Sequence, residues 1–320
     1  MESIKWGVLG YARIARLFVI PAIQRSTNSE FYAIASRDKE KLEKCQADFG
    51  CKKTYSSYDE LLDDPEVQAV YIPLPNSLHK EWTIKAARKG KHILCEKPMA
   101  LNAAECLEMV EESKKNNVVL MEAFMYRYTD RIRKVREIID SGVIGDVKYI
   151  NSTFRFFLNR ENDVRMVQEL GGGSLYDVGC YPLNFVGMVT GSVPVSVSAE
   201  FVKQDGVDVI FSALLRYGNG TIASINCGFN AFGKQFSEII GTKGIVEVPL
   251  TFSNDAGFIT VISHEGKREV EVLESDRYQL EIEDFSDAVL HNRKPLFSLD
   301  ETVRNMRILD DLMEKVRACK

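Results

Sequence analysis

Two short segments of this chain hold side chains that could move a proton at a reacting oxygen atom. One is Glu96-Lys97-Pro98, which ends an apolar run, and the other is the stretch 171–181, where Asp177 and Tyr181 follow three consecutive glycines. Hydride exchange between a nicotinamide and an alcohol or carbonyl carbon needs no metal if a positioned side chain handles the proton. A lysine and a tyrosine suit that task, and the two segments therefore predict an oxidoreductase.

Tyr181 is the candidate general acid and base, and Lys97 is the residue expected to tune it. A free phenol has a pKa of ~10, which is too high for an efficient base at neutral pH. A nearby ammonium favours the phenolate, so Lys97 would bring the pKa of Tyr181 closer to the working range. Lys97 could also donate to the substrate oxygen or hold the nicotinamide ribose.

Asp177 is the third catalytic candidate. It lies four residues before Tyr181, so both side chains fall on one face if this segment opens a helix. Its role could be to orient a substrate hydroxyl or Lys97. A first-turn carboxylate that complements the helix dipole is an equally open interpretation.

A dinucleotide would be held at the turn after the first apolar run, residues 4–10. The spacing there is Gly10-x-Ala12-x-x-Ala15, with Arg13 and Ile14 in between, a degenerate form of the glycine-rich dinucleotide turn. Small residues let backbone amides at a helix N-terminus reach a pyrophosphate. A plain strand-to-helix turn would look similar, but the position at the start of alternating strands and helices favours the dinucleotide.

The second apolar run ends in Ala35-Ser36-Arg37, where an acidic residue would accept from the ribose 2′-hydroxyl of NAD. A hydroxyl and a guanidinium suit a 2′-phosphate instead, because arginine can grip phosphate through two parallel hydrogen bonds. NADP(H) is therefore favoured over NAD(H). Two alternatives stay open: Arg37 could be a solvated charge at the helix entry, and Asp38 stands one residue late for the acidic role.

A further cofactor contact is expected after the apolar run 67–72, because open α/β sheets bind ligands at the carboxyl ends of their strands. Pro73, Leu74, Asn76 and His79 follow this run. Asn76 could instead cap the next helix. His79 could face the cofactor or merely pack.

The order of apolar and amphipathic segments predicts two domains. In residues 1–123 apolar runs alternate with amphipathic stretches, which is typical of a Rossmann fold with a doubly wound parallel sheet. In residues 124–320 short alternating strands predict an α/β domain with a large, mostly antiparallel open sheet. The expected strands are 4–10, 31–36, 67–72, 91–95, 118–122, 147–157, 194–203, 207–217, 220–229, 235–240, 244–248 and 258–263. The expected helices lie near 12–25, 38–49, 77–89, 102–116, 129–140, 276–291 and 299–317, with one more after Gly173.

Composition argues against several functions. The 320 residues carry a net charge of −5, which argues against a nucleic-acid or membrane-surface partner. No apolar stretch approaches the ~20 residues of a membrane helix, and the chain begins with a strand pattern rather than a signal peptide. Seven scattered cysteines without a Cys-x-x-Cys pair indicate a reducing, cytoplasmic compartment. Four histidines without metal-ligand spacing argue against a catalytic metal.

With these motifs in hand, the chain resembles the glucose–fructose oxidoreductase/inositol dehydrogenase (Gfo/Idh/MocA) family over essentially its whole length. The resemblance rests on the turn at Gly10, the Pro-x-Pro-Asn-x-x-His segment 73–79, Glu96-Lys97-Pro98, residues 122–127 and the glycine-rich stretch that ends at Tyr181. Many members have histidine where this chain has Tyr181. That departure makes the chain similar to the subgroup of glucose–fructose oxidoreductase, dimeric dihydrodiol dehydrogenase and NADP-dependent xylose dehydrogenase.

The resemblance implies a site between a Rossmann domain and a second domain whose open sheet often mediates dimerisation, so a homo-oligomer is expected. It implies that Lys97 is the family's lysine and that Glu96 and Lys97 lie beside the cofactor. It also implies that Arg165 lies near cofactor or substrate, although an ordinary loop charge is an open alternative. For Glu122 and Arg127, an ion pair between the domains is as open as a ligand contact.

The sequence therefore predicts an NADP(H)-dependent oxidoreductase acting on a hydroxyl or carbonyl carbon of a sugar or cyclic polyol. Oxidation of an aldopyranose at C1 ranks first, by the resemblance alone. Oxidation of a trans-dihydrodiol and reduction of a keto-sugar are the alternatives among enzymes. A non-catalytic sensor that binds dinucleotide is an alternative of another class, and redox-neutral sugar chemistry with a tightly held NAD is a third.

Overall fold

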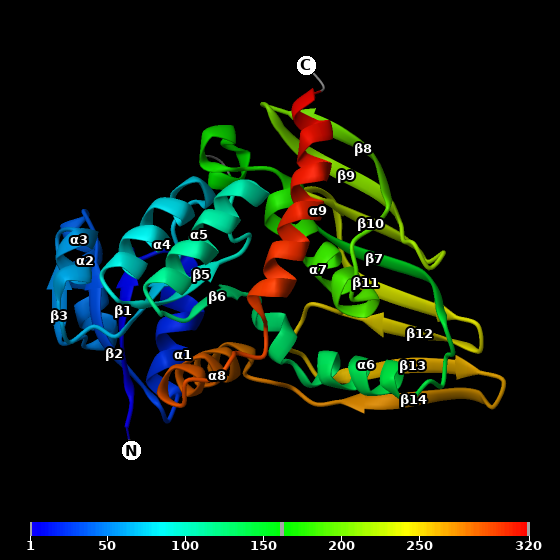
Figure 1. Ribbon diagram of the computed structural model, residues 1–320, viewed down its shortest axis with the longest axis horizontal. Coiled ribbons are helices and arrows are strands. Elements are labelled where there is room, and N and C mark those ends of the chain that lie inside the picture. The colour runs from blue at the N-terminus through cyan, green and yellow to red at the C-terminus, as the bar shows by residue number, and fades with distance from the viewer. Residues whose placement is uncertain (1, 161–162, 319–320) are drawn as a thin grey trace. The chain divides into compact units, whose positions relative to one another are not determined.

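The chain forms two compact units in a computed structural model that describes residues 2–160 and 163–318 (Figure 1). The first unit consists of Met1–Met125 and Arg277–Thr302, and the second of Tyr126–Asp276 and Val303–Lys320. Each unit is built around its own sheet. The predicted fold class, a parallel Rossmann-type sheet followed by a mostly antiparallel one, is confirmed.

A six-stranded parallel sheet with the strand order β3-β2-β1-β4-β5-β6 forms the centre of the first unit. All four residues of β4 are buried, as expected for a sheet with helices on both faces. The strands are β1 (Ile4–Leu9), β2 (Ser29–Ala35), β3 (Lys53–Tyr55), β4 (Ala69–Ile72), β5 (His92–Glu96) and β6 (Leu120–Ala123). The α-helices are α1 (Ile20–Arg25), α2 (Lys39–Phe49), α3 (Tyr58–Asp63), α4 (His79–Arg88), α5 (Ala103–Lys115) and α8 (Arg277–Leu290). Short β3 and α3 were not among the predicted elements.

Helix α8 belongs to the first unit, although it comes late in the chain. It packs against α1, β1 and β2. The indole Nε1 of Trp6 donates to the hydroxyl of Ser286 at 3.2 Å, and the Trp6 and Phe285 rings lie 5.0 Å apart. The sequence pattern had placed everything after residue 123 in the second domain. An amphipathic helix shows which face is apolar but not which sheet it covers, so the assignment of 277–302 required the structure.

Two of the helices next to candidate site residues contain a π-helical turn near their start. The first, η1, spans Ala15–Val19 and runs into α1, and the second, η6, spans Leu175–Gly179 and runs into α7. A proline follows each turn closely, Pro21 in one case and Pro182 in the other. Because proline has no N–H to donate and its ring crowds the preceding turn, a widened turn accommodates it. The predicted helices exist, but their first turns are not α-helical.

The second unit is built on an eight-stranded sheet with the order β14-β13-β12-β11-β7-β10-β9-β8. Strands β10 and β7 are parallel, and all the other pairs are antiparallel. The strands are β7 (Val147–Phe157), β8 (Ser196–Gln204), β9 (Val207–Arg216), β10 (Ile222–Gly228), β11 (Asn230–Gly241), β12 (Gly244–Pro249), β13 (Gly257–Ser263) and β14 (Gly266–Val272). The α-helices are α6 (Asp130–Asp140), α7 (Cys180–Thr190) and α9 (Leu299–Ala318), the last of which begins in the first unit. The sequence pattern missed the charged strand β14.

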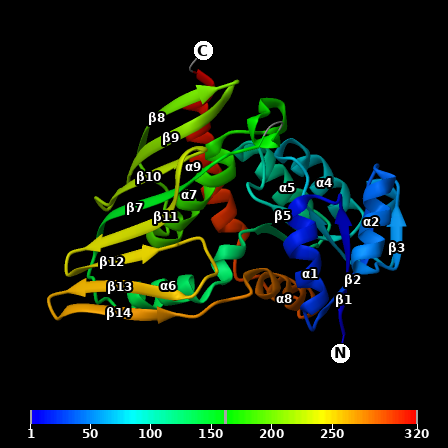
Figure 2. The same ribbon diagram turned by 180° about the vertical axis from the view of Figure 1, so that it is seen from behind.

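One face of this sheet is covered by α7, which packs against β7 and β10 (Figure 2). The strands alternate accordingly: in β9, Phe211, Ala213 and Leu215 are buried, whereas Ile210, Ser212 and Leu214 are exposed. The uncovered face is therefore open along the central strands. No helix among the described residues is long and apolar enough to span a membrane.

Candidate active site

The turn after β1 has the backbone that a dinucleotide turn requires. Gly10 has a φ of +103°, a conformation that L-residues rarely adopt, and its N–H donates to the carbonyl of Ala35 at 2.8 Å. A Cβ added to Gly10 would lie 3.4 Å from Leu74 Cδ2 and 3.4 Å from the hydroxyl of Tyr58. Gly10 therefore brings the ends of β1 and β4 close together, with Tyr58 beside them.

The strand order places this turn at the switch point of the sheet. Strand β1 pairs with β2 on one side and with β4 on the other, and ligands of open α/β sheets bind at the carboxyl ends of the strands at such a point. The candidates Gly10, Ala12, Arg13 and Ile14 follow β1, and Pro73, Leu74 and Asn76 follow β4. Leu78, not Asn76, occupies the N-cap position of α4, so Asn76 is not the cap of that helix.

The end of β2 separates the roles of Ser36, Arg37 and Asp38. Asp38 is the N-cap of α2: its carboxylate accepts from the Lys41 N–H and lies 3.3 Å from the Lys41 ammonium, and these contacts lower its pKa. The hydroxyl of buried Ser36 accepts from the Asp38 N–H at 3.1 Å. Arg37 is exposed. Burial raises the pKa of the Tyr58 phenol, and the positive charge of Arg37 offsets part of that increase. The carboxylate of Asp38 thus caps helix α2, and the guanidinium of Arg37 faces solvent.

Buried polar side chains fasten the segment that carries Lys97. The two ring nitrogens of His79 lie 3.0 Å from the Pro98 carbonyl oxygen and 2.8 Å from that of Leu74. The carboxylate of Glu122, on β6, accepts from the Met99 N–H at 2.9 Å. These contacts tie the loop after β5 to the loop after β4 and to β6. Lys97 is half-buried within this segment and is joined to Pro98 by a cis peptide bond.

His79 is an internal residue rather than a surface one. Its side chain is fully buried, and burial lowers the pKa of the imidazole. Of the two alternatives raised by the sequence, the packed one describes its position. His79 therefore joins the loop after β4 to the loop after β5.

Half-buried Glu96 belongs to a second group of polar side chains beside Lys97. The hydroxyl of Tyr71 donates to the Glu96 carboxylate at 2.5 Å, and the Lys97 N–H donates to the same carboxylate at 3.2 Å. Glu281, on α8, is also buried, and burial followed by the charge of Glu96 raises the pKa of its carboxyl well above 4.5. Sequence reasoning missed both Tyr71 and Glu281, because no local pattern links β4 and α8 to the end of β5.

In the second unit, Asp177 is paired with Arg165. The Arg165 Nε donates to the Asp177 carboxylate at 2.6 Å, and its Nη1 donates to Asp163 at 3.2 Å. Burial lowers the pKa of the guanidinium, but the two carboxylates more than offset this effect and raise it. Two residues singled out separately from the sequence are therefore partners.

Glycines and one buried carboxylate fix the start of the helix that carries Asp177 and Tyr181. A Cβ on Gly172 would lie 2.5 Å from the Arg165 carbonyl oxygen, and one on Gly173, whose φ is +118°, would lie 2.3 Å from Asp208. Asp208, on β9, accepts from the Ser174 hydroxyl at 2.6 Å and from the Leu175 N–H at 2.8 Å. Asp208 is an anchor that sequence reasoning missed, since only sheet pairing brings β9 to this helix.

Tyr181 is held by aromatic packing. Its side chain is 5% exposed, and its ring lies 5.2 Å from that of Phe154, 5.6 Å from that of Phe252 and 5.7 Å from that of Tyr126. The Tyr126 hydroxyl donates to Asn184, which also accepts from Arg127 at 3.2 Å. The ring of Tyr181 thus has one fixed orientation within its unit. Lys97 and Tyr181 belong to different units, and each is positioned by its own.

No group of three or more histidine, cysteine, aspartate or glutamate side chains in the described residues could hold a metal ion. The polar groups that gather around Lys97 and Asp177 are hydrogen-bonded pairs and carboxylates rather than metal-ligand sets.

Comparison with known proteins identifies the family. Residues 4–124 match the model of an oxidoreductase family with an NAD-binding Rossmann fold, and residues 132–247 match the C-terminal domain of the Gfo/Idh/MocA proteins. The chain therefore belongs to the Gfo/Idh/MocA family of oxidoreductases, as the sequence motifs predicted.

Several relatives align over most of the chain. A D-xylose 1-dehydrogenase (NADP(+)) of Haloferax volcanii is 34% identical over 314 residues, covering 97% of this chain and 96% of that protein. A trans-1,2-dihydrobenzene-1,2-diol dehydrogenase of Xenopus tropicalis is 35% identical over 250 residues, covering 77% and 76%. KijD10, a 3-ketoreductase of Actinomadura kijaniata solved with NADP and TDP-benzene, superposes with a TM-score of 0.90 at 28% identity, covering 98% of each chain.

The buried carboxyl of Glu122 predicts a pH-dependent stability. Burial raises its pKa from 4.5 to about 7, so folding favours the protonated form. The stabilisation is fully present below pH 4.5 and is lost as the pH rises to about 7. The loss is at most about 3 kcal/mol, from the difference between the two pKa values. Glu122→Gln should flatten this slope, because the amide oxygen can still accept from Met99.

Urea unfolding of both proteins at several values between pH 5 and 8 measures the slope. Glu111→Gln, an exposed change on α5, is the control and should leave the slope of the wild type intact. Parallel stability curves for the wild type and Glu122→Gln would show that Glu122 is not the titrating group.

Proposed function

We propose that this protein is an NADP(H)-dependent oxidoreductase that transfers hydride to or from a hydroxyl or carbonyl carbon of a sugar or cyclic polyol. The observation that carries the proposal is that two segments of this Gfo/Idh/MocA chain are each held rigidly. One of them carries Lys97, and the other carries Tyr181. A rigid donor and a rigid acid/base are what hydride and proton transfer require. The D-xylose 1-dehydrogenase of Haloferax volcanii supports ranking oxidation of an aldose at C1 first.

The residues at the switch point fit a dinucleotide. The Gly10 turn, with Ala12, Arg13 and Ile14, would hold the pyrophosphate with backbone amides, and Leu74 and Asn76 would line the adjacent edge. Ser36 and Arg37 would hold the 2′-phosphate, since Asp38 is occupied as a helix cap. Glu96 and Lys97 would lie beside the nicotinamide ribose. When bound, the nicotinamide supplies hydride chemistry, and the chain supplies position and proton transfer.

Tyr181 is proposed as the residue that gives a proton to, or takes it from, the substrate oxygen. The ammonium of Lys97 would favour the phenolate and donate to the same oxygen. Asp177 would accept from a substrate hydroxyl while its charge is balanced by Arg165. His79 and Glu122 would act only through the backbone of residues 97–99.

Two other reactions are alternatives with specific support. The KijD10 superposition favours reduction of a keto-sugar, and the Xenopus relative favours oxidation of a trans-dihydrodiol. A non-catalytic sensor would need a bound dinucleotide but no Tyr181. We also propose that the protein resides in the cytoplasm, in keeping with six described cysteines that are all free thiols.

Turnover is tested by incubating the purified protein with NADP⁺ or NAD⁺ and a panel of aldoses, cyclic polyols and a trans-dihydrodiol, and following the absorbance of reduced nicotinamide. Tyr181→Phe should keep cofactor affinity and lose 10²–10⁴-fold in kcat on the reactive member of the panel. Tyr126→Phe removes a hydroxyl from the same aromatic cluster and is the matched control, which should retain most of the turnover. Near-normal kcat in Tyr181→Phe would remove this tyrosine from the mechanism.

Cofactor choice is tested at Arg37. Arg37→Gln should raise KM for NADP⁺ by about tenfold or more, because a charge-assisted bond to the 2′-phosphate is lost, and should leave KM for NAD⁺ nearly unchanged. Lys39→Gln, two residues later and paired with Glu43, is the control for loss of one positive charge. Equal effects of Arg37→Gln on both cofactors would contradict the proposed 2′-phosphate contact.

We further propose that the second unit mediates homodimerisation through the uncovered face of its sheet. Tyr149, Leu214 and Ile222 lie on that face and are 53%, 53% and 38% exposed, which is unusual for large apolar side chains. Light scattering should give twice the mass of the chain, and Leu214→Glu should reduce it to one. Val193→Glu, an exposed change outside the sheet, should not. A monomeric wild type would reject the proposal.

A further inference from the structure

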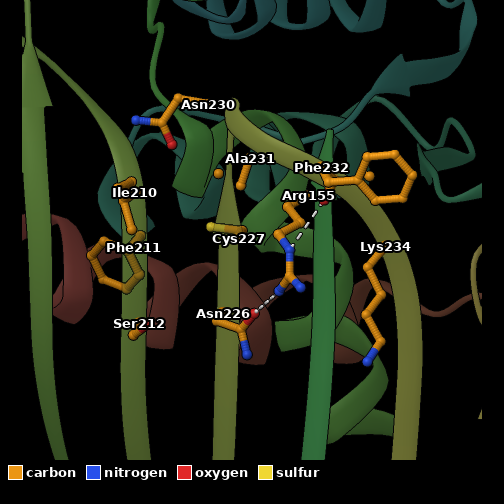
Figure 3. A pocket seen from close by; sticks show the side chains of 12 residues that line it. Arg155, Ile210, Phe211, Ser212, Asn226, Cys227, Asn230, Ala231, Phe232 and Lys234 are labelled. Carbon is orange, nitrogen blue, oxygen red and sulfur yellow. Dashed lines mark hydrogen bonds between the residues drawn. The ribbon is translucent and has the colours of Figure 1, made fainter. Parts of the chain in front are cut away.

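A pocket of about 750 Å³ lies on the sheet of the second unit, over β7, β9, β10 and β11 (Figure 3). Exposed Ile210 and Ser212 line it, so it opens on the uncovered face of that sheet. This face is the proposed interface between two copies of the chain, and the pocket therefore belongs to that interface. A different cluster, in the first unit, joins two cysteine side chains to the dinucleotide turn.

Cys45 and Cys51 meet at the end of helix α2, and both are buried. Gly50, with a φ of +66°, ends the helix, and its N–H donates to the Gln46 carbonyl at 2.9 Å. The residue after such a glycine commonly packs on a side chain about five or six residues earlier. Cys51 is that residue, and its Sγ also donates to the Gln46 Oε1 at 3.0 Å. The helix end thus brings two thiols together.

The contact between the two thiols makes them chemically different. Their hydrogen bond raises the pKa of Cys45 and lowers the pKa of Cys51. By contrast, burial raises the pKa of the Cys95 and Cys227 thiols well above the usual value. The thiolate is the nucleophile in thiol–disulfide exchange. Cys51 is therefore the thiol of the pair that is prepared to attack, and Cys45 is the neighbour that can complete the exchange.

The position of Cys51 at the edge of the first unit gives it a route to solvent. It lies directly before β3, a strand of three residues that is the edge strand of its sheet (Figure 1). The residues on either side of it, Gly50 and Lys52, are exposed. Short segments at the edge of a structure open at a lower free energy than its core. Local opening at this edge therefore brings a buried thiol to a reagent in solution.

The same end of α2 holds the dinucleotide turn. Tyr11, the residue after Gly10, donates its hydroxyl to the Asp48 carboxylate at 2.9 Å, and its ring lies 6.4 Å from that of Phe49. Asp48 and Phe49 are the last two residues of α2 and lie between the two cysteines in the sequence. A movement of this helix end therefore acts directly on the residue next to Gly10.

We propose that Cys45 and Cys51 form a reversible disulfide whose formation weakens dinucleotide binding at the Gly10 turn. The effect on binding rests on the proposed cofactor site, whereas the disulfide itself does not. An S–S bond is only about 2 Å long, so its formation draws Cys51 closer to the helix than a contact between thiols does. The resulting shift of the helix end disturbs the partners of Tyr11.

A small disulfide such as oxidised glutathione serves as the oxidant. Cys51, once deprotonated, attacks one sulfur of the oxidant, the S–S bond of the oxidant breaks, and the leaving thiolate takes a proton from solvent. Cys45 then loses its proton to solvent and attacks the Cys51 sulfur, which releases the second thiolate. The two cysteines thus lose two electrons and two protons, and the oxidant becomes two thiols.

Disulfide formation is tested on the full chain in glutathione buffers of increasing oxidised fraction. Remaining thiols are alkylated in denaturant, and peptide mass spectrometry quantifies the Cys45–Cys51 crosslink, which dithiothreitol should reverse. Cys51→Ala should abolish the crosslink and leave Cys45 open to alkylation. Cys106→Ala, which changes a buried cysteine on α5, is the matched control and should form the crosslink like the wild type.

The effect on the cofactor is tested by calorimetry with NADP⁺ on the reduced and the oxidised protein. Oxidation should raise the Kd by about fivefold, which corresponds to the loss of one hydrogen bond. Tyr11→Phe lacks the hydroxyl that bonds to Asp48, so its Kd should be raised when reduced and change little on oxidation. Tyr55→Phe removes a tyrosine–aspartate bond elsewhere in the same unit and should respond to oxidation like the wild type.

The possible failures separate the parts of the proposal. Cysteines 45 and 51 that both stay free in excess oxidised glutathione would overturn it, as would a glutathione adduct on Cys51 that Cys45 never displaces. A disulfide that leaves the Kd for NADP⁺ unchanged would overturn its effect on the cofactor. A reduced protein that binds no NADP⁺ would reject the proposed function together with that effect, and the mass measurement would still decide the disulfide.

Discussion

The candidate site depends on how the backbone of residues 96–99 is held. Three buried side chains from different elements reach it: Tyr71 on β4, His79 on α4 and Glu122 on β6. Each of these side chains forms a hydrogen bond with a carboxylate, a carbonyl or an amide of residues 96–99. None of the three elements directly adjoins this segment in the sequence. Breaking these contacts would leave buried polar groups without partners, so they favour one position of the loop. The direction in which Lys97 leaves the backbone follows from this arrangement.

In the second unit, other contacts hold the segment that carries Asp177 and Tyr181. Glycines allow the chain to pass against Arg165 and Asp208, the Asp208 carboxylate fixes the start of the helix, and aromatic rings enclose Tyr181. The pairing of Arg165 with Asp177 then balances the charge of a half-buried carboxylate. Each unit thus holds its own candidate residues in place. Little reorganisation of side chains is left for the moment of reaction.

The sequence predicted the elements better than their partners. Apolar runs and breaks located most strands, because these signals are local, and local motifs singled out Gly10, Lys97 and Tyr181 as candidates. The place of α8, the anchor Asp208 and the buried Glu281 depend on contacts across long stretches of chain, which no local pattern encodes. The π turns had a local signal in Pro21 and Pro182, which follow them closely.

Two buried carboxyls near Lys97 differ in what their protonation does. Glu281, on α8, has its pKa raised first by burial and then by the charge of Glu96, so a neutral acid is the form compatible with its surroundings. Glu122 has a pKa of about 7, because the Met99 N–H and the charge of Lys97 partly offset the effect of burial. A proton gained or lost at Glu122 therefore changes the charge near Lys97. The same group that fixes the position of the lysine thus also couples its electrostatic surroundings to pH near neutrality.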